Sequence, residues 1–251
     1  RLEAATPLAN LLADDIELLK KLVVYQPGGH LQQLQWRIKD QHWQLAGQFD
    51  ELQSKPAGDI PGVAGVSGRF LVSDKIAKVS LQAKSGELSW DGLFSGPIAY
   101  DNFGATLYAQ PAADRWRLLI PSFSFSSTDL TLDGSLALDE RLQILARLQQ
   151  VDAANASKYF PQRYMPQSVR HYLEQAIVAG KLDDATLLWH GVPAEFPYVE
   201  QQGVFQVLAK LEQGEFVFAP DWPAIHQLAA TLYFENASML IQSQQGELAG
   251  L

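Results

Sequence analysis

The sequence has no cysteine among its 251 residues, and only 19% of its residues are charged. The absence of cysteine excludes disulfide bonds, thiol catalysis and zinc sites built from cysteine. Asp and Glu total 28 against 19 Lys and Arg, which gives a net charge of -9. The longest basic run is Lys20-Lys21. Because nucleic-acid binding needs clustered cations, the sequence predicts no nucleic-acid partner.

Long apolar runs are also missing, since no stretch approaches the ~20 residues of a membrane-spanning helix. The chain begins at Arg1 without an initiator methionine and ends in mid-pattern at Leu251. We therefore expect a piece of a longer protein, in which a signal peptide or membrane anchor can lie upstream. The lack of cysteine fits the periplasm, although cytosolic domains without cysteine are common.

Sequence motifs for metal binding, nucleophilic catalysis and phosphate binding are absent as well. The histidines, at positions 30, 42, 171, 190 and 226, are scattered and show no metal-ligand spacing such as HExxH. No G-x-S-x-G nucleophile motif and no glycine-rich phosphate loop occurs. The sequence therefore predicts no catalytic residues, no metal, no cofactor and no enzymatic activity.

What the sequence does contain is alternation of apolar and polar residues over most of its length. A first hairpin is predicted between Leu31 and Phe49. Short turns separate the later strands, which favours an antiparallel meander over βαβ units. Two later stretches, 130–138 and 205–218, carry apolar rows of this kind. From these rows we predict the lining of a binding surface: Leu130, Leu132, Leu136, Leu138, Phe205, Val207, Ala209, Leu211, Phe216 and Phe218.

Two short amphipathic helical segments interrupt the strands. The first is predicted from Pro7 to Val23, after an N-cap at Thr6. The second zone, 152–179, is broken by Pro161 and Pro166. Its last part has an apolar face from Val169 to Ile177, and Gly180 stands where a left-handed C-terminal cap belongs.

Similar amino-acid sequences follow both helices, which suggests a duplicated unit. Gly29 to Trp36 resembles Gly180 to Trp189, and ATLY occurs at both 105–108 and 230–233. We therefore predict two helix-plus-meander units, 1–150 and 151–251, the second truncated at its C-terminal end. Two short helices cannot cover so many apolar strand faces. We expect a mainly β fold whose meander curls into an elongated apolar groove, a repeating β-groove. The alternative is a closed β-sandwich.

The residues also carry a family resemblance over nearly the whole chain. The segments that carry it include Tyr159-Phe160-Pro161, Pro166 through Leu173, Leu182 to Ala185, and Ala219 to Pro223. This combination resembles the central region of the YhdP-type proteins of the AsmA-like superfamily. Phe218 stands where the family commonly has Tyr.

The resemblance implies a non-enzymatic module of a bridge-like lipid transfer protein in Gram-negative bacteria. Such proteins are anchored in the inner membrane, reach through the periplasm and move phospholipids towards the outer membrane, supporting its permeability barrier. The implied partners are phospholipid acyl chains, the inner membrane through an upstream anchor, and outer-membrane or other envelope proteins. The resemblance assigns no catalytic residues.

Two other functions stay open at this point. A closed sandwich would fit a structural or adaptor module that binds other envelope proteins with its outer face. A polysaccharide-binding module would need aromatic rings aligned on an exposed face, with Trp36, Trp43, Trp90 and Trp222 as candidates.

Overall fold

The structure is a computed structural model that describes residues 26–40, 42–58, 60–112 and 115–248. The chain divides into two units, Arg1–Phe125 and Ser126–Leu251. The helix predicted from Pro7 to Val23 lies outside the described residues. The boundary predicted at 150/151 depends on the sequence repeat and stays a prediction.

Unit 1 is a meander of long strands. The pairing order is β1-β2-β3-β4-β7-β8, and β5 pairs with β3 and β6. Ile38 faces Trp43 across the β1–β2 turn, which confirms the predicted hairpin. The strands are β1 (Gly28–Lys39), β2 (His42–Gln53), β3 (Gly62–Ser73), β4 (Ala77–Ala83), β5 (Gly86–Ser89), β6 (Ile98–Tyr100), β7 (Asn102–Ala112) and β8 (Arg115–Ser126).

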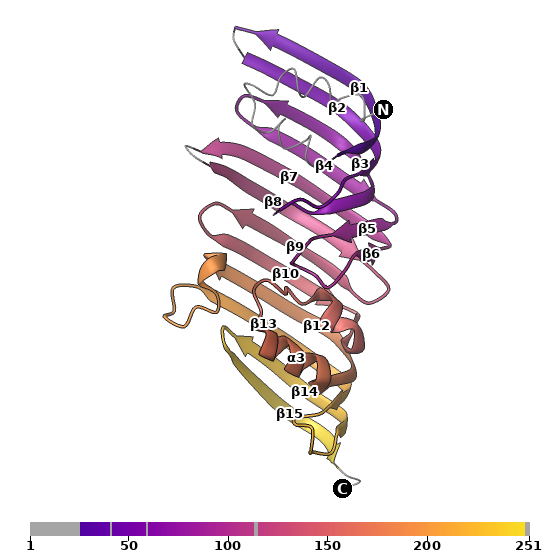
Figure 1. The fold of residues 1–251 in the computed structure, drawn as a ribbon, viewed down its shortest axis with the longest axis vertical. Helices are drawn as coiled ribbons and strands as arrows, with labels where there is room; N and C mark the ends of the chain where they lie inside the picture. Colours follow the sequence, from indigo (N-terminus) through magenta and orange to yellow (C-terminus); the bar gives the residue numbers. More distant parts are fainter. Residues whose placement is uncertain (1–25, 41, 59, 113–114, 249–251) are drawn as a thin grey trace. The chain divides into compact units, whose positions relative to one another are not determined.

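Unit 2 is also a meander of antiparallel strands, and its described residues include helices. Its order is β9-β10-β12-β13-β14-β15, with β11 paired to β12. Figure 1 shows α3 lying across the face of the sheet near β13 and β14. The elements are β9 (Thr131–Leu138), β10 (Leu142–Gln149), β11 (Val151–Asp152), the 3₁₀-helix η2 (Ala153–Tyr159), α3 (Gln167–Ala176), β12 (Ile177–Gly191), the 3₁₀-helix η3 (Pro193–Glu195), β13 (Val204–Phe216), β14 (Ile225–Glu235) and β15 (Ser238–Leu248).

The fold is mainly β and antiparallel, as predicted. Among the described strands of each unit, none forms a second sheet against the apolar face. No second sheet therefore covers the apolar face of either unit in the described residues, and the closed β-sandwich is not the fold. No helix in the described ranges is long and apolar enough to cross a membrane.

Bulges bend the strands of unit 2 along one margin. Gln213 in β13 and Gln227 in β14 have φ values of 51° each, and both lie at shifts in the strand register. Gly180 in β12 has φ of +141° at a similar shift. A bulge adds an unpaired residue, which increases the local twist and bends the strand. Bulges on three neighbouring strands therefore give this end of the sheet its curvature.

The second helix ends earlier than its apolar pattern predicted. The division of 152–179 into η2 and α3 around the two prolines is confirmed, but α3 stops at Ala176. The Val217 N–H donates to the Ala176 carbonyl at 2.9 Å, and Ile177 already pairs with Phe216. Strand pairing therefore ends the helix, and Gly180 is a bulge residue within β12 rather than a helix cap.

Candidate binding groove

The apolar residues of unit 2 are brought together by strand register. Residues directly opposite in an antiparallel pair share a face of the sheet. One row across the unit follows this rule from β9 to β15: Leu132, Leu148, Ala185, Ala209, Leu232 and Ile241. A neighbouring row is Gly134, Ala146, Leu187, Val207, Phe234 and Met239. Every side chain in both rows is apolar or absent, so the rows form one continuous apolar face.

The opposite face of the same strands is mostly polar. The corresponding row is Asp133, Arg147, Thr186, Leu208, Tyr233 and Leu240. Arg147 Nε donates to Asp184 Oδ1 at 2.8 Å on this side. We refer to the apolar side as the inner face and to this side as the outer face.

The two rows predicted to line a surface lie on the inner face together. Leu132 of β9 lies in register with Ala185 of β12 and Ala209 of β13, with one residue of β10 between β9 and β12. Leu136 of β9 lies in register with Trp189 and Phe205 in the same way. Their role in lining a groove stays a prediction.

The predicted residues differ in how deeply they are covered. Leu130, Ala209, Leu211 and Phe216 are buried. Phe218 lies beyond the end of β13, is 38% exposed, and has its ring 4.8 Å from that of Phe216. The remaining residues are half-buried, except for Leu138 at the end of β9, which is exposed.

Helices η2 and α3 cover one part of the inner face. Ala153, Leu173 and Ala176 are buried, and the two alanines belong to one apolar cluster with Ala209 and Leu211 of β13. The polar side of α3 carries Arg170 and Glu174, whose charged groups are 3.7 Å apart. The helix is thus amphipathic as predicted, with its apolar side on the sheet.

Polar contacts hold η2 in place. Asp129 Oδ2 accepts from Lys158 Nζ at 2.9 Å and from the Tyr159 hydroxyl at 3.2 Å. The Tyr159 hydroxyl also lies 2.8 Å from Ser127 Oγ. Burial raises the pKa of Tyr159, and its hydrogen bond with Ser127 opposes that shift. Asp152 caps the first turn by accepting from the Ala154 N–H at 3.1 Å.

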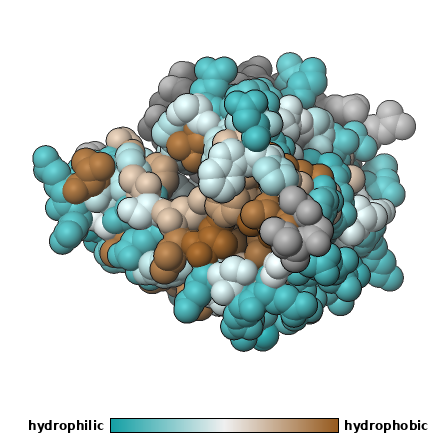
Figure 2. All heavy atoms as spheres, turned by 90° about the horizontal axis from the view of Figure 1, so that it is seen from below, coloured by the Kyte–Doolittle hydropathy of each residue, from teal (hydrophilic) through white to brown (hydrophobic). Residues whose placement is uncertain are grey.

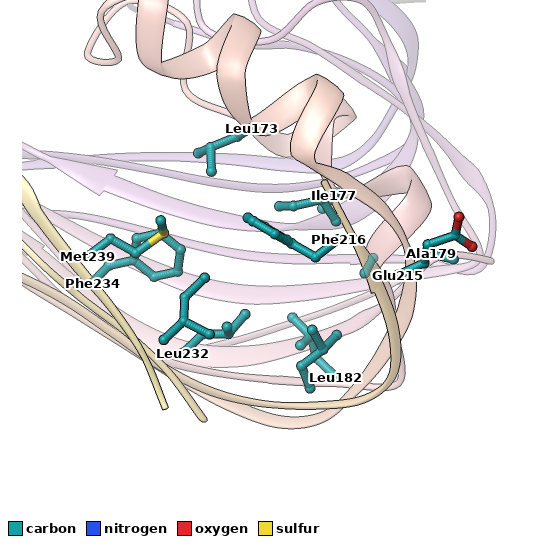
Figure 3. Close-up of a pocket in the computed structure, with 13 residues that line it drawn as sticks. Leu173, Ile177, Ala179, Leu182, Glu215, Phe216, Leu232, Phe234 and Met239 are labelled. Atoms are coloured by element: carbon teal, nitrogen blue, oxygen red, sulfur yellow. The ribbon is translucent and has the colours of Figure 1, made fainter. Parts of the chain in front are cut away.

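A narrow apolar cavity, partly open to solvent, remains between α3 and the sheet. Figure 3 shows Leu173 and Ile177 above it and Leu182 and Leu232 below it. Of the lining residues, only Glu215 has a charged side chain, and its carboxylate points away from the apolar cluster. Glu215 Oε1 lies 3.7 Å from His226 Nδ1. The cavity can therefore hold apolar groups and offers no polar contact within it.

An aromatic cluster closes the inner face at the β12–β13 loop. The Trp189 ring packs 5.1 Å from Phe205, 5.4 Å from Phe196 and 5.6 Å from Tyr164. Trp189 Nε1 donates to the Tyr198 hydroxyl at 2.7 Å. Burial raises the pKa of Tyr198, and the hydrogen bond from Trp189 opposes that shift. The groove is thus bordered by α3 on one side and by these rings on the other.

Figure 2 views the molecule from the β15 side. Hydrophobic residues gather at the centre of this view, and hydrophilic residues surround them. Met239 of β15, which lines the cavity, is 38% exposed. The apolar interior of unit 2 therefore reaches solvent near β15.

Some lining residues were missed by sequence reasoning. Met239 and Ile241 lie on β15, whose alternation fades into polar residues after Ile241. Leu173 and Ile177 belong to the predicted apolar face of the second helix, which was expected to prop or cap the sheet and was not assigned to the lining. The apolar face of that helix was the signal that it packs on the sheet and can line the groove.

Unit 1 has the same two-faced pattern. One inner row is Gly47, Phe70, Val79 and Leu107, and the outer row beside it is Gln48, Arg69, Ser80 and Thr106. Trp36 and Trp43 share the inner face through their partners Leu45 and Ile38. Trp222 is exposed on a loop of unit 2, so the four candidate tryptophans do not all lie in one unit.

In the described part of the chain, no three His, Asp or Glu side chains gather as a metal site. What the arrangement offers is an apolar inner face backed by a mostly polar outer face, suited to a ligand whose long part is hydrocarbon.

Comparisons of the sequence with known proteins identify its family. No solved structure matches the chain. A curated relative, the "Intermembrane phospholipid transporter YhdP" of Escherichia coli (strain K12), is 29% identical over 198 residues, which make up 76% of this chain and 16% of that protein. The family model described as "YhdP protein" matches residues 1–251. The chain therefore belongs to the YhdP protein family.

Proposed function

We propose that the chain is a non-enzymatic phospholipid transport module. It works in the periplasm as part of an inner-membrane-anchored bridge that carries lipids towards the outer membrane and supports its permeability barrier. The observation that carries the proposal is the inner face of unit 2, where strand register aligns apolar side chains from β9 to β15. The family and the printed name of the relative support the same class of ligand.

Physical chemistry explains why such a face helps lipid movement. An acyl chain in water costs ~0.8 kcal/mol per exposed CH₂, so a chain of ~16 carbons faces a penalty of order 10 kcal/mol. The inner face removes much of that penalty, while the polar headgroup remains in water at its margin. The predicted lining residues, from Leu130 to Leu138 and from Phe205 to Phe218, are our candidates for contact with the chain.

A charged residue on the inner face tests the proposal. Val207 is half-buried between Leu187 and Phe234 in an inner row. We expect Val207→Asp to lower co-purifying phospholipid, measured by mass spectrometry, by about tenfold, the factor that ~1.4 kcal/mol produces. Leu132→Asp should act in the same way.

Leu208→Asp is the matched control. Leu208 is the next residue of β13, lies on the outer face and is exposed. We expect this variant to retain phospholipid and a normal outer-membrane barrier in cells. A folded Val207→Asp protein with normal lipid content and a normal barrier would contradict the transport proposal.

The second candidate function is an adaptor module that binds other envelope proteins. It is favoured by exposed leucines on the outer face of unit 2, at positions 145, 188, 208 and 240. The same pair of variants separates the two functions. An adaptor would lose function in Leu208→Asp and keep it in Val207→Asp.

A further inference from the structure

The cavity beneath α3 differs from the rest of the inner face because it is covered. Leu173 of α3 and Ala156 of η2 line it from above, and Leu211, Leu232 and Ile241 line it from the sheet. Leu187 and Val207 of the neighbouring row are half-buried, do not line the cavity and lie outside the apolar cluster that contains residues of η2 and α3. A ligand in the cavity would therefore be enclosed, whereas one along Leu187 and Val207 would be in contact with water.

The lining of the cavity restricts what it can hold. Burying a polar group without a hydrogen-bond partner costs free energy, and the carboxylate of Glu215 points out of the cluster. A peptide segment would bury an amide group at every residue, and the neighbouring strands already pair with one another. A hydrocarbon chain has no such groups.

The opening determines how such a chain would lie. Met239, which lines the cavity, is 38% exposed, so the cavity reaches solvent beside it. Figure 2, which views the molecule from the β15 side, shows an apolar centre surrounded by hydrophilic residues. A polar headgroup can stay in water there while its tail extends beneath α3. On the covering side, Ala153 and Ala156 leave space that larger side chains would fill.

We propose that the cavity between α3 and strands β12 to β15 is a subsite for one acyl chain, with the polar end of that lipid at the β15 opening. This inference deepens the proposed transport function and depends on it. Within the groove, a two-chain lipid would place one tail beneath α3 and the other along the open row through Leu187 and Val207. The α3 segment would thereby hold a lipid in place rather than only cap the sheet.

Photolabelling tests the subsite. The probe is palmitate with a diazirine near its methyl end, added to the 251-residue chain. After illumination, mass spectrometry locates the label. We expect label on peptides that contain Leu173, Leu232 or Ile241. Ala156→Phe should reduce this label by about tenfold, which is the factor for ~1.4 kcal/mol of lost affinity.

The same 3₁₀-helix provides the matched control. Ala154 is exposed and does not line the cavity, so Ala154→Phe should leave labelling beneath α3 unchanged. A second pair of variants tests the same subsite if Ala156→Phe does not fold. Met239→Trp narrows the opening, and Leu240→Trp places the same ring on the exposed outer face.

The labelling pattern distinguishes a failure of the subsite proposal from a failure of the transport proposal. Label on the Val207 peptide in every protein, with none beneath α3, would overturn the subsite and leave the transport proposal standing. Label beneath α3 that is unaffected by Ala156→Phe and Met239→Trp would also overturn it. No label at any inner-face position would count against both proposals.

Discussion

At the scale of single residues, Tyr198 organises one margin of the groove. It is 1% exposed, and its hydroxyl accepts from Trp189. Gly191 and Gly203 flank its ring, where an added Cβ would lie 2.5 Å and 2.6 Å from ring carbons. The two glycines are needed because the ring occupies the space of their side chains. Tyr198 thereby fixes the β12–β13 loop beside Trp189.

Removing the Tyr198 hydroxyl should destabilise the protein. In Tyr198→Phe, Trp189 Nε1 stays buried without an acceptor, and an unpaired buried donor costs about 1–3 kcal/mol. We expect the free energy of unfolding, measured by urea titration, to fall by that amount. Tyr233→Phe is the control, because its hydroxyl bonds to Gln206 and Glu235 on the outer face, where water can replace it. Equal losses of unfolding free energy in both variants would show that the hydrogen bond from Trp189 contributes no more to stability than the exposed bonds of Tyr233.

At the scale of elements, the cover over the groove depends on how η2 is attached. Asp129 precedes β9 and binds both Lys158 and Tyr159 at the end of η2. The Asp129 side chain is 13% exposed and that of Lys158 is 53% exposed, so the charge-assisted bond from Tyr159 is the better shielded of the two. Loss of this attachment should free η2 before the sheet unfolds.

Asp129→Ala tests that attachment. We expect a loss of about 1.5–3 kcal/mol, since hydrogen bonds to a charged group are lost. Hydrogen exchange should quicken in η2 and α3 more than in β13. Asp184→Ala removes a carboxylate from the exposed pair with Arg147 and should leave both measurements almost unchanged. Uniform exchange across η2 and β13 in Asp129→Ala would argue against a separate cover.

The elements also bear on the proposed repeat. Gly29 in β1 and Gly180 in β12, which are equivalent in the sequence match, have φ values of 130° and 141° and lie at register shifts. The partner strands contain Glu51 and Gln213 with φ of 53° and 51°. The same bulge in both pairs supports a duplicated unit, although the domain boundary at 150/151 stays a prediction.

At the scale of the whole molecule, a lipid that binds only the folded state should stabilise it. Ligand at 100 times its Kd adds ~2.7 kcal/mol, which raises the Tm of a chain of this size by roughly 5–10 °C. We expect such a shift in calorimetry with palmitoyl lysophosphatidylethanolamine kept below its micelle concentration. Glycerophosphoethanolamine has the same headgroup without the acyl chain and should give no shift. An equal shift with both compounds would show that the headgroup, not the apolar face, provides the binding.

Much of the architecture follows from the sequence, because side chains of a strand alternate between two faces. That period predicted the antiparallel meander and the rows at Leu132 and Val207. Apolar residues at the helical period of 3.6 likewise identified an amphipathic helix before Gly180. These properties are local, since they depend on neighbouring residues along one segment of chain.

The tertiary structure decided which rows meet and what covers them. Strand register, not sequence spacing, places Leu132 in one row with Ala209 and Ile241. Pairing of Ile177 with Phe216 ended α3 early and made Gly180 a bulge, and left-handed conformations at Gln213 and Gln227 bend the strands. Glutamine has no local preference for such a conformation, which costs free energy in isolation. Only pairing with neighbouring strands compensates that cost, so the covered groove depends on contacts between segments far apart in the chain.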